Sequence, residues 1–134
     1  MPPTRPVPTN IAIVEDDAGI CEDLAQMIRE TGDMACACVC RNGRAALHKI
    51  PRCPTDIVIM DIQLPDSSGF QICQELRKRS KTVILIMMTG RFLSSEEKKQ
   101  GFELGADEYI TKPFDLAELS ARIKQLLSRN APRG

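Results

Sequence analysis

The chain has 134 residues with 18 basic and 18 acidic side chains, so its formal net charge is zero at pH 7. Its 43% apolar and 27% charged content is ordinary for one globular domain. No basic block supports nucleic-acid binding by this domain, and the longest unbroken apolar run, 83–88, is too short to span a membrane.

The first residues, 1–9, contain four prolines and no apolar stretch of signal-peptide length. We expect a disordered, proline-rich lead-in over 1–9, one domain over 10–128, and a tail or the start of a linker over 129–134. The missing secretion signal predicts a cytoplasmic protein whose six cysteines are free thiols.

Short apolar runs alternate with helical patterns along the chain. The expected strands are 10–14, 34–40, 56–60, 82–88 and 107–111. The expected helices begin at Asp17, at Asn42 or Gly43, near Ser68, at Ser94 and at Asp115. Five strands alternating with five helices predict an α/β fold: a single doubly wound, five-stranded parallel sheet of flavodoxin-like type with strand order 2-1-3-4-5.

Acidic side chains stand at the ends of two expected strands. Glu15 and Asp16 follow the first strand, and Asp61 follows the third. Because these strands are neighbours in the expected order, their carboxylates should converge at one edge of the sheet. Thr89 ends the fourth strand and Lys112 follows the fifth, so both can reach the same edge.

Gathering three carboxylates is unfavourable, since two charges 4 Å apart repel by about 4 kcal/mol at an effective dielectric of 20. A divalent cation removes this cost, and ligands that are all oxygen favour Mg²⁺. Such a cation, together with the ammonium of Lys112, would also allow Asp61 to attack a phosphoryl group.

These residues, in this order, resemble the motif set of response-regulator receiver domains over about residues 10–128. The matching positions are Glu15-Asp16, Asp61 with Leu64-Pro65 and Gly69, Thr89, the 105–109 stretch, and Lys112-Pro113.

The resemblance implies that Asp61 is phosphorylated by a histidine kinase or a histidine phosphotransfer protein. It implies that Asp16, Asp61 and the backbone carbonyl of Gln63 bind Mg²⁺ directly, with Mn²⁺ as a substitute, and that Glu15 acts through a metal-bound water. Gln63 and Arg91 occupy positions that tune hydrolysis of the acyl phosphate in this family.

The resemblance also implies a switch. Lys112 would pair with the phosphoryl oxygens, Thr89 would move toward them, and Tyr109 would swing into the space left by Thr89. The peptide bond between Lys112 and Pro113 would be cis. The output face would comprise the helix over 94–104, the strand over 107–111 and the helix from Asp115, used for homodimerisation, for a partner or for an attached effector domain.

Three alternatives remain. A degenerate receiver would act as a constitutive interaction module. An aspartate-dependent phosphatase would need a second acidic residue at the position of Gln63. We therefore expect a switch and not an enzyme, with at most self-phosphorylation from phosphoryl donors and slow autodephosphorylation. A redox sensor would use Cys36, Cys38 and Cys40. We expect these residues to lie on one face of a strand as buried thiols. Their spacing along the strand is too wide for a zinc site.

Overall fold

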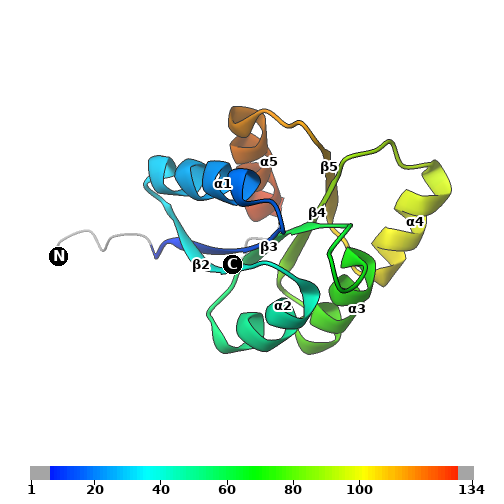
Figure 1. The fold of residues 1–134 in the computed structure, drawn as a ribbon. Helices are drawn as coiled ribbons and strands as arrows, with labels where there is room; N and C mark the ends of the chain where they lie inside the picture. Colours follow the sequence, from blue (N-terminus) through cyan, green and yellow to red (C-terminus); the bar gives the residue numbers. More distant parts are fainter. Residues whose placement is uncertain (1–6, 130–134) are drawn as a thin grey trace.

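The structure is a computed structural model that describes residues 7–129. One sheet contains five parallel strands in the order β2-β1-β3-β4-β5, with helices on both faces (Figure 1). The predicted fold class and strand order are therefore confirmed. The elements are β1 (Thr9–Val14), α1 (Ala18–Thr31), β2 (Met34–Cys40), α2 (Gly43–Lys49), the 3₁₀ helix η1 (Ile50–Arg52), β3 (Ile57–Asp61), α3 (Gly69–Arg79), β4 (Ile84–Thr89), α4 (Ser95–Leu104), β5 (Glu108–Thr111) and α5 (Leu116–Arg129).

Two apolar clusters hold the layers together. Helices α1 and α5 cover one face of the sheet, where Ile13, Ile59 and Ile86 are fully buried. Helices α2 and α3 cover the other face, over residues such as Val58 and Leu85. The central strands are thus apolar on both faces, which explains why they appear as continuous apolar runs in the sequence.

Short-range capping defines where several helices begin. The Asp17 carboxylate accepts from the Ile20 amide at 3.1 Å at the start of α1. Ser68 and Ser94 form capping boxes at the starts of α3 and α4. The predicted beginnings of these helices are therefore confirmed, including that of α4.

Residues 7–129 include the whole of the predicted domain over 10–128 and the last residues of the predicted lead-in. β1 begins at Thr9, inside the predicted lead-in, because the Thr9 amide donates to the Asp33 carbonyl at 3.0 Å. The lead-in over 1–6 and the tail over 130–134 lie outside the described residues. Among residues 7–129, no helix has the length and apolar character that a bilayer crossing requires.

A bulge in β2 changes the predicted arrangement of the cysteines. Cys36 pairs with Ile11 and Cys38 pairs with Ala12, so one residue is skipped and the side-chain alternation shifts. Cys36 is exposed, whereas Cys38 and Cys40 belong to the cluster under α2. The sulfurs of Cys38 and Cys40 are 3.9 Å apart.

The prediction that these three cysteines share one face as buried thiols is therefore wrong, and so is the argument that their sulfurs lie far apart. The spacing along a strand fixes the Cα positions, but side-chain rotation brings neighbouring thiols together. All six cysteines are free thiols, as predicted. Burial raises the pKa of Cys38 to about 12, which keeps this thiol protonated and unreactive at neutral pH.

Candidate functional site

Strand pairing brings the acidic side chains to one edge of the sheet. Strands β1 and β3 are parallel neighbours, with Val14 opposite Met60. Glu15 follows Val14, and Asp61 is the last residue of β3. Both carboxylates therefore lie at the carboxyl ends of adjacent strands, as the sequence predicts.

The ammonium of Lys112 lies between these two carboxylates. Its Nζ is 2.6 Å from Oε1 of Glu15 and 2.7 Å from Oδ2 of Asp61. Lys112 itself is held by its amide, which donates to the Thr89 carbonyl at 2.7 Å, and its peptide bond to Pro113 is cis. Only 1% of the Glu15 side chain and 13% of the Asp61 side chain are exposed, so this is a largely buried, ion-paired cluster.

Burial sets the protonation of this cluster. It raises the pKa of Glu15 to about 7, and the neighbouring Asp61 adds to the rise while Lys112 opposes it. For Lys112, burial lowers the pKa, but the bonds to Asp61 and Glu15 outweigh this effect and raise it. At neutral pH the cluster therefore contains a charged lysine and a Glu15 that readily accepts or loses a proton.

The second oxygen of Asp61 is held by the loop that follows β3. The Gln63 amide donates to Oδ1 of Asp61 at 2.9 Å. Gly69 closes this loop, because its amide donates to the Ile62 carbonyl at 2.6 Å and a Cβ at this position would lie 2.8 Å from the Cα of Ile62. The glycine is therefore required by close approach of the backbone.

Asp16 lies at the rim of the cluster and is exposed. Its amide donates to Oε2 of Glu15 at 3.0 Å, and its carbonyl accepts from the Arg41 guanidinium at 2.7 Å. Arg41 is not among the residues predicted from the sequence. Its position directly after β2, at the same edge of the sheet, was the available signal.

The predicted switch residues lie beside the cluster, on β4 and β5. Thr89 ends β4, is only 5% exposed, and donates its hydroxyl to the Arg91 carbonyl at 2.9 Å. The Tyr109 hydroxyl donates to the Lys98 carbonyl on α4 at 3.1 Å, and its ring packs edge-on against Phe102. In this structure Tyr109 therefore contacts α4.

The oxygen donors of the site fit a hard divalent cation in their chemistry. The carboxylates of Asp16 and Asp61 and the carbonyl of Gln63 are the ligand type that Mg²⁺ and Mn²⁺ prefer. Within residues 7–129, no three carboxylate, histidine or cysteine side chains converge as a ready-made metal cage. Lys112 instead supplies the positive charge between Glu15 and Asp61.

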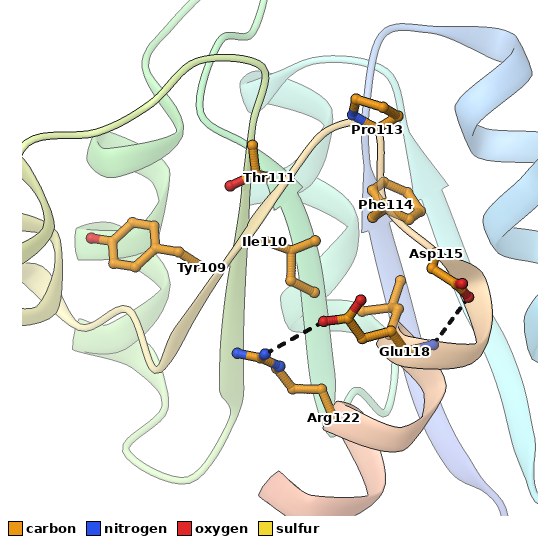
Figure 2. Close-up of a pocket in the computed structure, with 9 residues that line it drawn as sticks. Tyr109, Ile110, Thr111, Pro113, Phe114, Asp115, Glu118 and Arg122 are labelled. Atoms are coloured by element: carbon orange, nitrogen blue, oxygen red, sulfur yellow. Dashed lines mark hydrogen bonds and ion pairs between the residues drawn. The ribbon is translucent and has the colours of Figure 1, made fainter.

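A separate hollow lies on the predicted output face, between β5 and α5 (Figure 2). Its volume is about 320 Å³, and Tyr109, Phe114 and Arg122 are among its lining residues. Arg122 pairs with Glu108 at 3.1 Å and lies 3.9 Å from Glu118. This part of the face is thus lined by charged groups that already have partners.

Comparisons with known proteins agree with this geometry. A family model for the response regulator receiver domain matches residues 11–124. Sensory transduction protein RegX3 of Mycobacterium bovis is 44% identical over 121 residues, which are 90% of this chain and 52% of that protein. The chain thus spans about half the length of the curated relatives it matches.

Solved structures show the same relationship. A CheY-like receiver domain protein from Methanospirillum hungatei has a TM-score of 0.84 and 28% identity, covering 92% of this chain and 96% of that one. The BeF₃-activated receiver domain of DrrB, a Thermotoga maritima protein, has a TM-score of 0.80 and 30% identity, covering 92% of this chain and all of that one. The chain therefore belongs to the response regulator receiver domain family of two-component signalling systems.

Proposed function

We propose that this chain is a phosphoacceptor switch in which Asp61 takes a phosphoryl group from a histidine kinase or a histidine phosphotransfer protein. The observation that carries the proposal is the ammonium of Lys112, held within 2.7 Å of both Asp61 and Glu15 at the edge of the sheet. A half-buried ammonium at this position would stabilise the negative charge that gathers on the phosphoryl oxygens during transfer.

In the transfer step, a carboxylate oxygen of Asp61 attacks the phosphorus of a phosphohistidine. The new O–P bond forms as the P–N bond breaks, and the imidazole nitrogen leaves with the electron pair. Lys112 then moves its hydrogen bonds from the carboxylates to the phosphoryl oxygens, and the Thr89 hydroxyl donates to one of them. Attack of water at the phosphorus later breaks the O–P bond, restores the Asp61 carboxylate and releases inorganic phosphate, and Gln63 and Arg91 would tune the rate of this step.

The proposed phosphoryl transfer includes the divalent cation expected from the sequence. Asp16, Asp61 and the Gln63 carbonyl would hold Mg²⁺ or Mn²⁺ directly, and Glu15 would contact it through a water. When bound, the cation would supply charge neutralisation between the acceptor and the incoming phosphoryl group.

The output would be a rearrangement of the face formed by α4, β5 and α5, in which Tyr109 leaves its contact with α4. Phosphorylation shifts a two-state equilibrium through the contacts that it makes in only one state. We propose that this face serves a homodimer, a partner protein or an attached effector domain, in a cytoplasmic pathway. In RegX3, about half of the protein lies beyond the matched region, which leaves room for such an effector. We propose no nucleic-acid contact for the receiver domain itself.

The test is phosphorylation of the purified chain by acetyl phosphate with Mg²⁺, followed by intact mass and site mapping. We expect one phosphoryl group on Asp61, and no labelling of the Asp61→Asn variant, whose fold is checked by thermal unfolding. Asp33→Asn, an exposed carboxylate outside the cluster, is the matched control and should label like the unaltered chain.

Two other outcomes would overturn the proposal. An unaltered chain that neither labels nor binds beryllofluoride would instead be a degenerate receiver that acts as a constitutive interaction module. Sustained turnover of small phosphate esters would make the chain a phosphatase.

A further inference from the structure

The hydroxyl of Thr89 is fully engaged within its own loop. It donates to the Arg91 carbonyl at 2.9 Å and accepts from the Arg91 amide at 3.2 Å. Because a hydroxyl has a single proton to donate, Thr89 cannot donate to a group on Asp61 while this arrangement persists. The backbone of Arg91 therefore determines whether Thr89 is available.

The side chain of Arg91 is anchored in turn. Its guanidinium makes a two-pronged ion pair with the carboxylate of Glu97, one prong being Nη1 to Oε1 at 3.2 Å. The same Nη1 also donates to the Phe92 carbonyl at 3.4 Å. Two-pronged pairs between arginine and a carboxylate fix orientation as well as distance.

Glu97 connects this pair to the first turn of α4. Its Oε1 accepts from the Ser94 amide at 3.1 Å, while the Ser94 hydroxyl accepts from the Glu97 amide at 3.1 Å. The hydrogen bond from Arg91 lowers the pKa of Glu97 to about 2, so this carboxylate is charged throughout the neutral range. Leu93, between the two partners, is 2% exposed and anchors the middle of the loop in the core.

We propose that the ion pair between Arg91 and Glu97 positions Thr89 in its disengaged orientation and thereby holds the receiver in its resting state. This inference rests on the proposed role of Asp61 as phosphoacceptor. The pair is a latch: to reach a phosphoryl group on Asp61, Thr89 must leave both bonds to the backbone of Arg91, and the ion pair holds that backbone where these bonds form.

The latch has a defined thermodynamic consequence. It stabilises only the resting arrangement, so removing it raises the population in which Thr89 is free to engage a phosphoryl group. A ligand that binds only the engaged state should therefore bind more tightly to a protein without the latch. Exposed ion pairs contribute modestly, so we expect a change of about two- to five-fold.

The test uses beryllofluoride, a mimic of the phosphoryl group, at saturating Mg²⁺. The variants are Arg91→Ala, Glu97→Gln, the double variant and the exchanged pair Arg91→Glu with Glu97→Arg. Glu97→Gln retains an oxygen that can accept from Ser94, so the helix cap persists. Glu96→Gln is the control, because Glu96 is exposed in the same turn and makes no ion pair within the described residues.

We expect each single variant to bind beryllofluoride about two- to five-fold more tightly, and the double variant to gain no more than either single one. The exchanged pair should return toward the unaltered affinity, and Glu96→Gln should not change it. In the absence of beryllofluoride, the methyl NMR resonance of Thr89 should shift in the latch variants toward its position in the beryllofluoride complex.

Other results would overturn the inference in distinguishable ways. Weaker binding by Arg91→Ala together with tighter binding by Glu97→Gln would make Arg91 a phosphoryl ligand. Equal affinities in all variants, or an unmoved Thr89 resonance, would show that the pair does not position Thr89. If neither the unaltered chain nor any variant binds beryllofluoride, the proposed function fails. The latch is then judged from the ligand-free proteins alone: the Thr89 resonance should differ between the latch variants and the unaltered chain but stay in place in Glu96→Gln, and an unmoved resonance would overturn the latch.

Discussion

Strands β4 and β5 are neighbours in the sheet, yet they differ sharply in burial. All six residues of β4 are buried, whereas none of the four residues of β5 is. The helix between them, α4, buries only Gly101. The proposed acceptor Asp61 thus lies at the buried centre, formed by β1, β3 and β4, while Tyr109 lies on the looser edge, formed by α4 and β5. The proposed switch would need this division, because phosphoryl transfer requires fixed geometry and the response requires a segment that moves at low cost.

The largest effect should come from truncation in the buried centre. Leu85→Ala on β4 removes a fully buried side chain, and we expect a loss of about 3–4 kcal/mol in the free energy of unfolding, measured in urea. Phe102→Ala on α4 removes a side chain that is 46% exposed and should cost less than about 1.5 kcal/mol. Equal losses would show that the edge is packed as tightly as the centre.

The charge cluster of the centre should be nearly as sensitive. Lys112→Ala leaves Glu15 and Asp61 without their shared cation, and we expect a loss of about 3 kcal/mol at pH 8 without divalent cations. Added Mg²⁺ should recover part of this loss, because it supplies positive charge to the same carboxylates. Lys124→Ala, at an exposed position of α5, should stay within about 0.5 kcal/mol. A similar loss for both variants would contradict the importance of the buried pairs.

At the edge, Gly101→Ala should alter the position of Tyr109 more than it alters the fold. A Cβ at Gly101 would clash with the Tyr109 hydroxyl and lie 2.6 Å from Cε1 of Phe70. We expect a cost of about 2 kcal/mol and displacement of the Tyr109 ring, seen in its NMR resonances. Gly90→Ala has open space around its new methyl group and is the control for stability. An unmoved Tyr109 would mean that α4 shifts instead.

The smallest expected effect is a pH dependence at Glu15. Because burial raises its pKa from 4.5 to about 7, the folded protein holds a proton on Glu15 between these pH values that the unfolded chain has released. The stability from this group is therefore present at lower pH and lost as pH rises toward 7.

Without divalent cations, we expect the unaltered protein to lose about 1 kcal/mol more than the Glu15→Gln variant between pH 5 and pH 6. Thermal unfolding across this range measures the difference. Identical slopes for the two proteins would show that Glu15 is ionised throughout.

Site residues whose position depends only on where a strand ends are predicted well from the sequence. Asp61, Thr89 and Lys112 each terminate or follow an apolar run, and parallel pairing must then bring them to one edge. The helix starts at Ser68 and Ser94 can also be predicted from the sequence, because their capping partners, Gln71 and Glu97, lie only three residues further along the chain.

Contacts between residues far apart in the sequence could not be predicted from local patterns. Arg77 of α3 donates to the carbonyls of Val83 and Gly105 and pairs with Asp107 at 2.8 Å, yet no local pattern identifies these partners. The same holds for Arg41 beside Asp16. The bulge in β2 also has no sequence signal, because skipping one residue is decided by how the strand fits its neighbour.

The position of Tyr109 has one practical consequence. It is the sole tyrosine, and the chain has no tryptophan, so ultraviolet-excited emission of this protein comes almost entirely from one phenol ring. That ring lies between Phe102 and Phe70, with its hydroxyl on α4. The unlabelled protein therefore carries a built-in optical probe at the edge formed by α4 and β5, and the proposed rearrangement of that edge could be followed in real time by fluorescence alone.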